Sequence, residues 1–103
     1  MRRRGRFADL IRRQLDHFVA DESPLLQEAA EANSAWTNAG ANESEELYGD
    51  YQLVVDTIGE RLYDIRETYA ARLDERAADD YRAAFNRAAG KRFRRFAGLL
   101  EDE

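Results

Sequence analysis

Residues 44–73 read SEELYGDYQLVVDTIGERLYDIRETYAARL, and this stretch decides the fold. Its aliphatic and tyrosine side chains recur at alternating steps of three and four residues, which keeps them on one side of an α-helix. They are Tyr48, Tyr51, Val55, Ile58, Leu62, Ile65 and Tyr69. A helix over these residues would rise about 45 Å. Its apolar stripe needs cover from the rest of the chain or from a second copy.

A shorter helix is predicted over residues 6–20, where one face is apolar. That face holds Phe7, Ile11, Leu15 and Phe18. Pro24 then interrupts the pattern, because proline donates no N–H yet fits the first turn of a new helix. Ser23 is therefore the predicted N-cap of a second helix over residues 24–37, with one kinked helix through Pro24 as the alternative. In both cases the inward side chains are Leu25, Ala29, Ala32 and Trp36.

The second half of the chain predicts one loop and one further helix. Residues 37–42 are the loop, and Asn42 with Glu45 three residues later is a capping-box pattern. Asp74 is the predicted cap of a last helix from residue 75, whose apolar face holds Tyr81, Phe85, Ala89, Phe93, Phe96 and Leu100. An interior glycine costs about 1 kcal/mol relative to alanine, so a split of this helix at Gly90 stays open.

These elements predict an all-α fold, an up-and-down bundle of three to four helices with one long central helix at about 44–73. A chain of 103 residues has room for a single domain, 1–103. Within it we expect residues 1–5 to be a flexible basic tail and residues 101–103 to be an acidic tail.

Composition excludes several classes of protein. The chain has no cysteine, which rules out disulfides and thiolate metal sites and suits a cytoplasmic location. No apolar run is long enough to span a membrane. The basic start MRRRGR resembles that of a signal peptide, but Asp9 and Arg12 follow where an apolar core would be needed. We therefore expect a cytoplasmic protein with no membrane partner.

Basic residues concentrate near both ends of the sequence. Residues 1–13 and 87–95 each carry a net charge of +5, whereas residues 14–86 carry −12. In a four-helix up-and-down bundle the first helix starts, and the last helix ends, at the same pole. We therefore predict a basic pole that could bind phosphates of nucleic acid or another anionic surface. Its candidate residues are Arg2, Arg3, Arg4, Arg6, Arg12, Arg13, Arg92, Arg94 and Arg95.

Acidic residues at helical spacing offer a weak metal-site pattern. Asp56, Glu60 and Asp64 recur every fourth residue but lie opposite the apolar stripe, so they are expected to face water. A carboxylate-bridged metal bundle would usually need Glu-x-x-His pairs, and this chain has one histidine, His17. We predict no metal and no cofactor.

A polar margin borders the predicted stripe on the long helix. It consists of Gln52, Gly59, Tyr63 and Arg66. The margin could admit a small anion. The favoured alternative is structural: Trp36 would pack over Gly59, and Glu28 or Glu31 would pair with Arg66.

The functional prediction is a non-enzymatic helical protein-interaction module whose partner is a second copy of the chain, forming a homodimer, or another protein. The three serines have no histidine placed beside them by any spacing, and no catalytic motif occurs. The long helix is about twice the length of either predicted helix before it, so part of its stripe should lie uncovered. The candidate interface residues at its two ends are Tyr48, Tyr51, Tyr69 and Leu73. The alternative function is nucleic-acid or anionic-surface binding at the basic pole.

Overall fold

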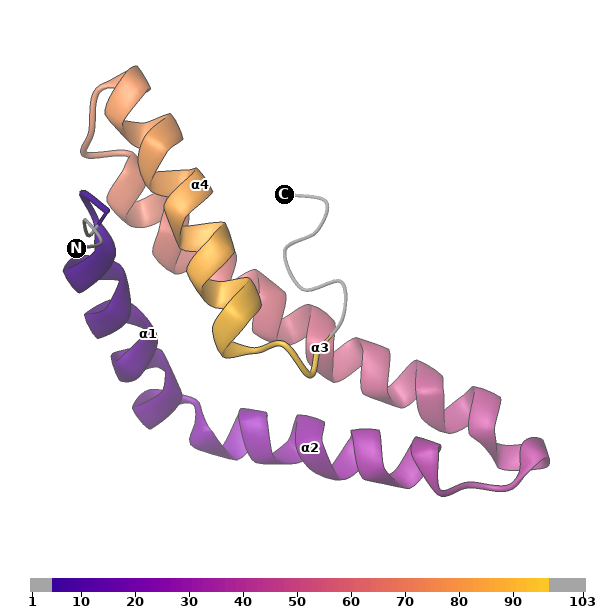
Figure 1. The fold of residues 1–103 in the computed structure, drawn as a ribbon. Coiled ribbons are helices and arrows are strands. Elements are labelled where there is room, and N and C mark those ends of the chain that lie inside the picture. The colour runs from indigo at the N-terminus through magenta and orange to yellow at the C-terminus, as the bar shows by residue number, and fades with distance from the viewer. Residues whose placement is uncertain (1–4, 97–103) are drawn as a thin grey trace.

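The computed structural model describes residues 5–96, and these residues form four α-helices and no strand (Figure 1). They are α1 (Ala8–Asp21), α2 (Ser23–Thr37), α3 (Ala41–Ala70) and α4 (Glu75–Arg92). The predicted all-α bundle with one long helix is confirmed, although α3 begins and ends three residues earlier than the sequence suggested. Leu100 and both predicted tails except Gly5 lie outside the described residues. None of the described helices combines the length and apolarity needed to cross a bilayer.

A turn at Glu22 separates α1 from α2, so the structure has two helices there and not one kinked helix. The Glu22 N–H still donates to the Phe18 carbonyl at 2.8 Å, while the Glu22 carbonyl accepts from Leu26 at 3.0 Å. Pro24 is the second residue of α2, where a missing N–H costs nothing. The prediction of Ser23 as the N-cap is wrong, because Ser23 is already helical and Glu22 takes that position.

Three further predictions about helix ends have mixed outcomes. Asp74 caps α4 as predicted, since its Oδ1 accepts from the Ala77 N–H at 2.9 Å. The capping box at Asn42 is wrong: α3 begins one residue earlier, after the extended backbone of Gly40 (φ −71°, ψ 166°). The split at Gly90 does not occur, and α4 continues through it to Arg92.

The pairing of side chains gives the direction of each helix. On α1 and α4, Phe7 packs on Tyr81 (5.4 Å between ring centroids) and Phe18 on Phe93 (5.7 Å), so the two helices run parallel. On α3 and α4, Tyr69 packs on Tyr81 (4.9 Å), whereas the earlier Arg66 bonds to the later Asn86, so this pair is antiparallel.

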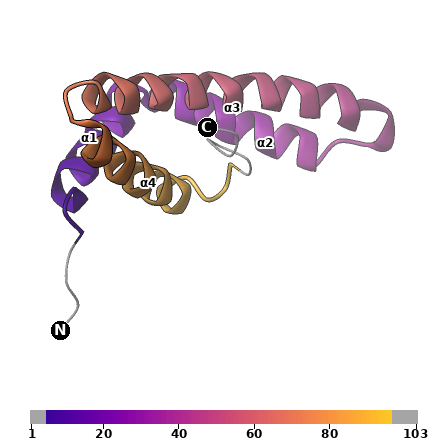
Figure 2. The ribbon, with the colours of Figure 1, turned by 90° about the horizontal axis from the view of Figure 1, so that it is seen from above.

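The helices divide the molecule into two halves, and Figure 2 shows the α2–α3 hairpin extending well past the end of α4. We call residues 23–57, which form α2 and the first part of α3, the arm. The three-helix half consists of α1, the rest of α3 and α4. Helix α3 rises about 45 Å and α4 about 27 Å, because they contain 30 and 18 residues. The first part of α3 therefore lacks a third helix against it.

Burial follows this division. The largest fully buried side chains all lie in the three-helix half: Tyr81, Phe85, Ile11, Leu15, Ile58 and Leu62. In the arm only Ala29, Tyr51 and Val55 are buried. The first ten residues of α3, 41–50, contain no buried residue. The sequence-predicted stripe thus forms a real core only from Tyr51 onward.

Candidate functional site

The exposed end of the arm carries a cluster of aromatic rings. Trp36 of α2 packs edge-on against Tyr48 of α3, with 4.8 Å between ring centroids, and Tyr51 lies 6.0 Å from Tyr48. Tyr51 is buried beneath them, where Phe96 from beyond α4 also contacts it. Tyr48 is 41% exposed and Trp36 is half-buried. Amphipathic rings presented in this way are typical anchors of protein interfaces.

The arm is also uniformly acidic. It contains no lysine, arginine or histidine, and its seven carboxylates are all exposed: Glu28, Glu31, Glu43, Glu45, Glu46, Asp50 and Asp56. None of the seven forms an ion pair with any residue that the structure describes. The surface around the Trp36–Tyr48 cluster is therefore negatively charged, and residues 5–96 do not neutralise it by ion pairs.

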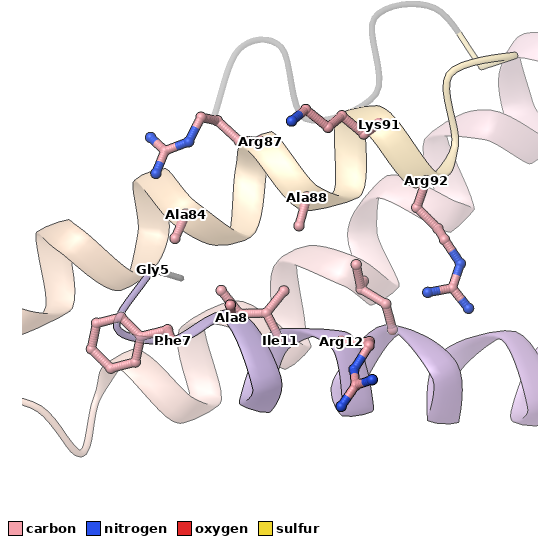
Figure 3. Close-up of a pocket in the computed structure, with 11 residues that line it drawn as sticks. Gly5, Phe7, Ala8, Ile11, Arg12, Ala84, Arg87, Ala88, Lys91 and Arg92 are labelled. Atoms are coloured by element: carbon pink, nitrogen blue, oxygen red, sulfur yellow. The ribbon is translucent and has the colours of Figure 1, made fainter. Parts of the chain in front are cut away.

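A hollow of about 550 Å³ lies on the three-helix half, between α1 and α4 (Figure 3). Figure 3 shows the short side chains of Ala8, Ala84 and Ala88 in the space where the two helices face each other. Three alanines there fill less volume than larger side chains would, and the space remains open. The lining residues are Gly5, Phe7, Ala8, Ile11, Arg12, Leu15, Ala84, Arg87, Ala88, Lys91 and Arg92.

Four cations surround this apolar hollow, and no carboxylate is among its lining residues. Arg12 pairs with Asp9 at 3.5 Å and Arg92 with Asp16 at 2.6 Å, both acids lying on α1. Arg87 and Lys91 are exposed and have no ion pair within residues 5–96. The hollow therefore combines an apolar floor with two uncommitted positive charges, an arrangement suited to an acidic group attached to an apolar one.

The predicted basic pole is not formed by the described residues. Because α1 and α4 are parallel, Arg6 at the start of α1 lies near the beginning of α4, about 20 Å in helix rise from Arg94. Arg12 and Arg92 do meet at the hollow, but Arg13, Arg94 and Arg95 are not among its lining residues. The parallel arrangement arises because the chain bends at Glu22 without reversing, so α1 and α2 do not form the hairpin that an up-and-down bundle needs (Figure 1). Arg2, Arg3 and Arg4 lie outside the described residues.

The four predicted interface residues have different environments. Tyr48 is exposed, as expected of an anchor. Tyr51 is only 8% exposed, and burial raises the pKa of its phenol, so the prediction that it is an exposed anchor is wrong. Tyr69 and Leu73 are partly buried against the core, and Tyr69 packs on Tyr81. Tyr51 and Tyr69 therefore pack within this chain, on Phe96 and on Tyr81 of α4 respectively, while Leu73 is partly buried against the same core.

The polar margin contains one buried charge. Arg66 is 3% exposed; its Nε donates to Glu67 at 2.8 Å and its Nη1 to Asn86 at 2.8 Å. Its guanidinium also lies over the Tyr63 ring at 4.9 Å. The prediction that Glu28 or Glu31 pairs with Arg66 is wrong, because both acids are on α2 in the arm, whereas Arg66 lies in the three-helix half.

Glu67 links the buried Arg66 to a second arginine, Arg82, which is partly exposed. Arg82 of α4 donates to both Glu67 oxygens, with Nε at 2.9 Å from Oε2. The hydrogen bonds from Arg82, and secondarily those from Arg66, hold the pKa of Glu67 below its usual range. The hydrogen-bond partners of Arg66, Glu67 and Asn86, both lie within the chain, so the network has a structural role joining α3 to α4.

The other members of the margin, Gln52, Gly59 and Tyr63, differ in their exposure and contacts. Gln52 is exposed and donates to the Tyr48 hydroxyl at 3.3 Å. Tyr63 is 38% exposed and Gly59 is half-buried. Trp36, predicted to pack over Gly59, instead contacts Tyr48 and Tyr51.

The acidic pattern on α3 does not assemble a metal site in the part of the chain that the structure describes, where no three His, Asp or Glu side chains gather closely enough. Asp56, Glu60 and Asp64 are exposed, as their helical spacing predicted. His17 and Asp21 form an exposed surface pair at 3.0 Å.

Comparisons of the chain with protein families, with curated proteins and with solved structures find no match. The arm and the hollow are therefore the candidate functional surfaces of this protein. Sequence reasoning missed the hollow. Its signal was Ala84 and Ala88 at i, i+4 with Arg87 and Lys91 beside them, but nothing local indicated that α1 would lie opposite.

Proposed function

We propose that this protein is a non-enzymatic, cytoplasmic interaction module that self-associates, with the arm as a contact surface. The observation that supports the proposal most strongly is that α3 outruns α4, which leaves the first part of α3 and its partner α2 without a third helix. An amphipathic helix gains most of its stability from packing its apolar face. A second copy would supply the packing that one chain does not give to the arm.

The Trp36–Tyr48 cluster is the predicted centre of this contact. Both rings lie on the outer part of the arm, and Tyr48 is one of the exposed large hydrophobic residues of the described chain. Aromatic residues at the middle of an interface commonly carry most of its binding energy. The arm thus offers an exposed aromatic anchor on a pair of helices that extends past the end of α4.

Molar mass by size-exclusion chromatography with light scattering tests the proposal. We expect a mass near twice the 11.9 kDa of one chain at micromolar loading. Tyr48→Glu should return the protein to the monomer mass with its helicity retained, because Tyr48 is exposed within one chain. The matched control is Tyr63→Glu, a tyrosine of similar exposure on the same helix but outside the arm. A wild-type monomer at every loading concentration would rule the proposal out.

Anion binding is the second candidate, and it is favoured by Arg87 and Lys91 beside the hollow, which form no ion pair with a described residue. Binding of nucleic acid should appear in a gel shift and weaken steeply as salt rises, since counterions are released. The acidic arm opposes this role, because it repels a polyanion that extends beyond the hollow.

A further inference from the structure

The hollow and the arm are complementary surfaces carried by the same chain. The hollow has four cations around an apolar floor and no carboxylate in its lining, whereas the arm has seven exposed carboxylates around an aromatic cluster and no cation. Each surface lacks what the other supplies. Within one chain they belong to different halves of the molecule, so neither surface neutralises the other.

We propose that the hollow is the docking site for the arm of a second copy, so that two chains associate reciprocally with each arm on the other's hollow. This inference rests on the proposed self-association and names the surface that the arm contacts. A reciprocal contact uses the same two patches on both chains and therefore closes as a two-fold dimer.

Charge favours this pairing over contact between two arms. Two arms brought together would place two sets of unpaired carboxylates in one interface, and like charges in contact oppose association. On the hollow, Asp9 and Asp16 occupy Arg12 and Arg92 in part, but Arg87 and Lys91 have no ion pair with any described residue. Those two cations are the ones most available to carboxylates from outside.

Shape supports the same pairing. The hollow measures about 550 Å³, and its floor is formed by Phe7, Ile11 and Leu15 with three alanines at the helix contact. An aromatic side chain fits a depression of this size. Tyr48 is a suitable occupant because its ring already projects from the arm, 41% exposed. By helical spacing Glu45 lies one turn before Tyr48, and Asp56 lies about two turns after it and about 80° around α3. Both carboxylates are exposed and would meet the cations at the rim.

A charge-swap experiment tests the proposal. The hollow variant carries Arg87→Glu and Lys91→Glu, and the arm variant carries Glu45→Arg and Asp56→Arg; all four residues are exposed, so both variants should fold. We expect each variant alone to have the monomer mass by light scattering. An equimolar mixture should regain the dimer mass, because the substituted positions 45 and 56 of one chain then face the substituted positions 87 and 91 of the other with opposite charges. The control, Arg13→Glu with Arg76→Glu, makes the same charge change outside the hollow lining and should leave the dimer intact.

Salt gives a second readout on the wild-type protein. A contact between the acidic arm and the basic hollow should weaken as sodium chloride rises from 0.05 to 0.5 M, with a rise in Kd of about tenfold or more as the charges are screened. A contact between two acidic arms should instead become tighter over the same range.

Each other outcome overturns a definite statement. A wild-type monomer removes the self-association itself, and this inference with it. A wild-type dimer that survives in the hollow variant overturns the inference alone. Monomeric variants that do not recover the dimer mass on mixing show that the two surfaces do not meet. Masses above that of a dimer would overturn the reciprocal closure, since a head-to-tail contact that does not close forms open chains.

Discussion

The arm and the three-helix half use helices of similar length to very different effect. Helix α2 has 15 residues and buries one of them, Ala29, whereas α4 has 18 residues and buries five. The difference lies in the number of neighbours. Helix α4 lies against both α1 and α3, whereas α2 packs mainly along α3 and otherwise contacts α1, its neighbour in sequence. Helical content alone therefore says little about where the core of this protein lies.

The two halves also differ in how they treat charge. The three-helix half contains the ion pairs that join separate helices, such as Arg82–Glu67 and Arg92–Asp16, and Arg61–Glu22 ties α3 to the break between α1 and α2. The arm contains acids alone. The three-helix half pairs part of its charge within the described chain, whereas none of the arm's carboxylates forms an ion pair with a described residue.

The largest expected effect compares one core residue from each half. Phe85→Ala should lower the free energy of unfolding by about 3–5 kcal/mol, because the ring is fully buried and its removal leaves a cavity. Leu25→Ala in the arm should lower it by about 1 kcal/mol, since Leu25 is only partly buried. Urea denaturation followed by circular dichroism measures both. Equal losses would mean that the arm is packed as tightly as the three-helix half, and the comparison would fail.

The ion-pair network should give an intermediate, pH-dependent effect. Glu67→Gln should lower the free energy of unfolding by about 2 kcal/mol at pH 7, because charge-assisted bonds to Arg66 and Arg82 are lost. The pKa of Glu67 is lowered in the fold, so its contribution is present above its ordinary pKa of about 4.3. That contribution is lost as pH falls through the lower folded-state pKa.

Denaturation at several pH values measures this difference. The wild-type and Glu67→Gln curves should converge as the solution becomes more acidic than pH 4. The arm provides the control: Glu31→Gln should have almost no effect at any pH, since Glu31 is exposed and has no ion pair with a described residue. A gap between wild type and Glu67→Gln that persists at pH 2 would show that packing, not charge, accounts for the loss.

The smallest expected effect tests whether the two halves unfold together. Gly49 in the arm and Gly90 in α4 both lie inside helices, and an added Cβ would meet no other atom within 4 Å. Each change to alanine should raise the free energy of unfolding by about 0.5–1 kcal/mol, because alanine favours the helix more than glycine does. Both gains should appear in global unfolding, since one continuous core cluster spans both halves. Thermal denaturation measures the gain. Gly40→Ala is the control and should give none, since alanine is a poor N-cap. A gain from Gly90→Ala without one from Gly49→Ala would mean that the arm frays before the rest unfolds.

Sequence pattern predicted the local features of this fold well. Periodicity located all four helices, because the inward positions of α1 and α4 repeat at helical spacing, and those positions are buried in the structure. Asp74 was recognised as a cap from its place before the last helix. Errors arose where local signals competed: Ser23 and Asn42 are good capping residues, yet both helices begin before the position that their side chains would cap.

The candidate sites were harder to predict, because they depend on which helices become neighbours. Tyr51 and Tyr48 belong to one stripe with the same local pattern, but Phe96 covers only Tyr51. Arg66 is likewise buried although arginine is usually exposed, because its guanidinium donates hydrogen bonds to Glu67 and Asn86.

The sequence by itself determined the helices, the acidic character of the arm and the absence of cysteine chemistry, because these follow from composition and from spacing along the chain. Only the tertiary structure decided that α1 runs parallel to α4. That choice replaced a single basic pole with a hollow lined by Arg12, Arg87, Lys91 and Arg92. The physical reason is that periodicity fixes which face of a helix is apolar, whereas the partner of that face depends on contacts between residues far apart in the chain.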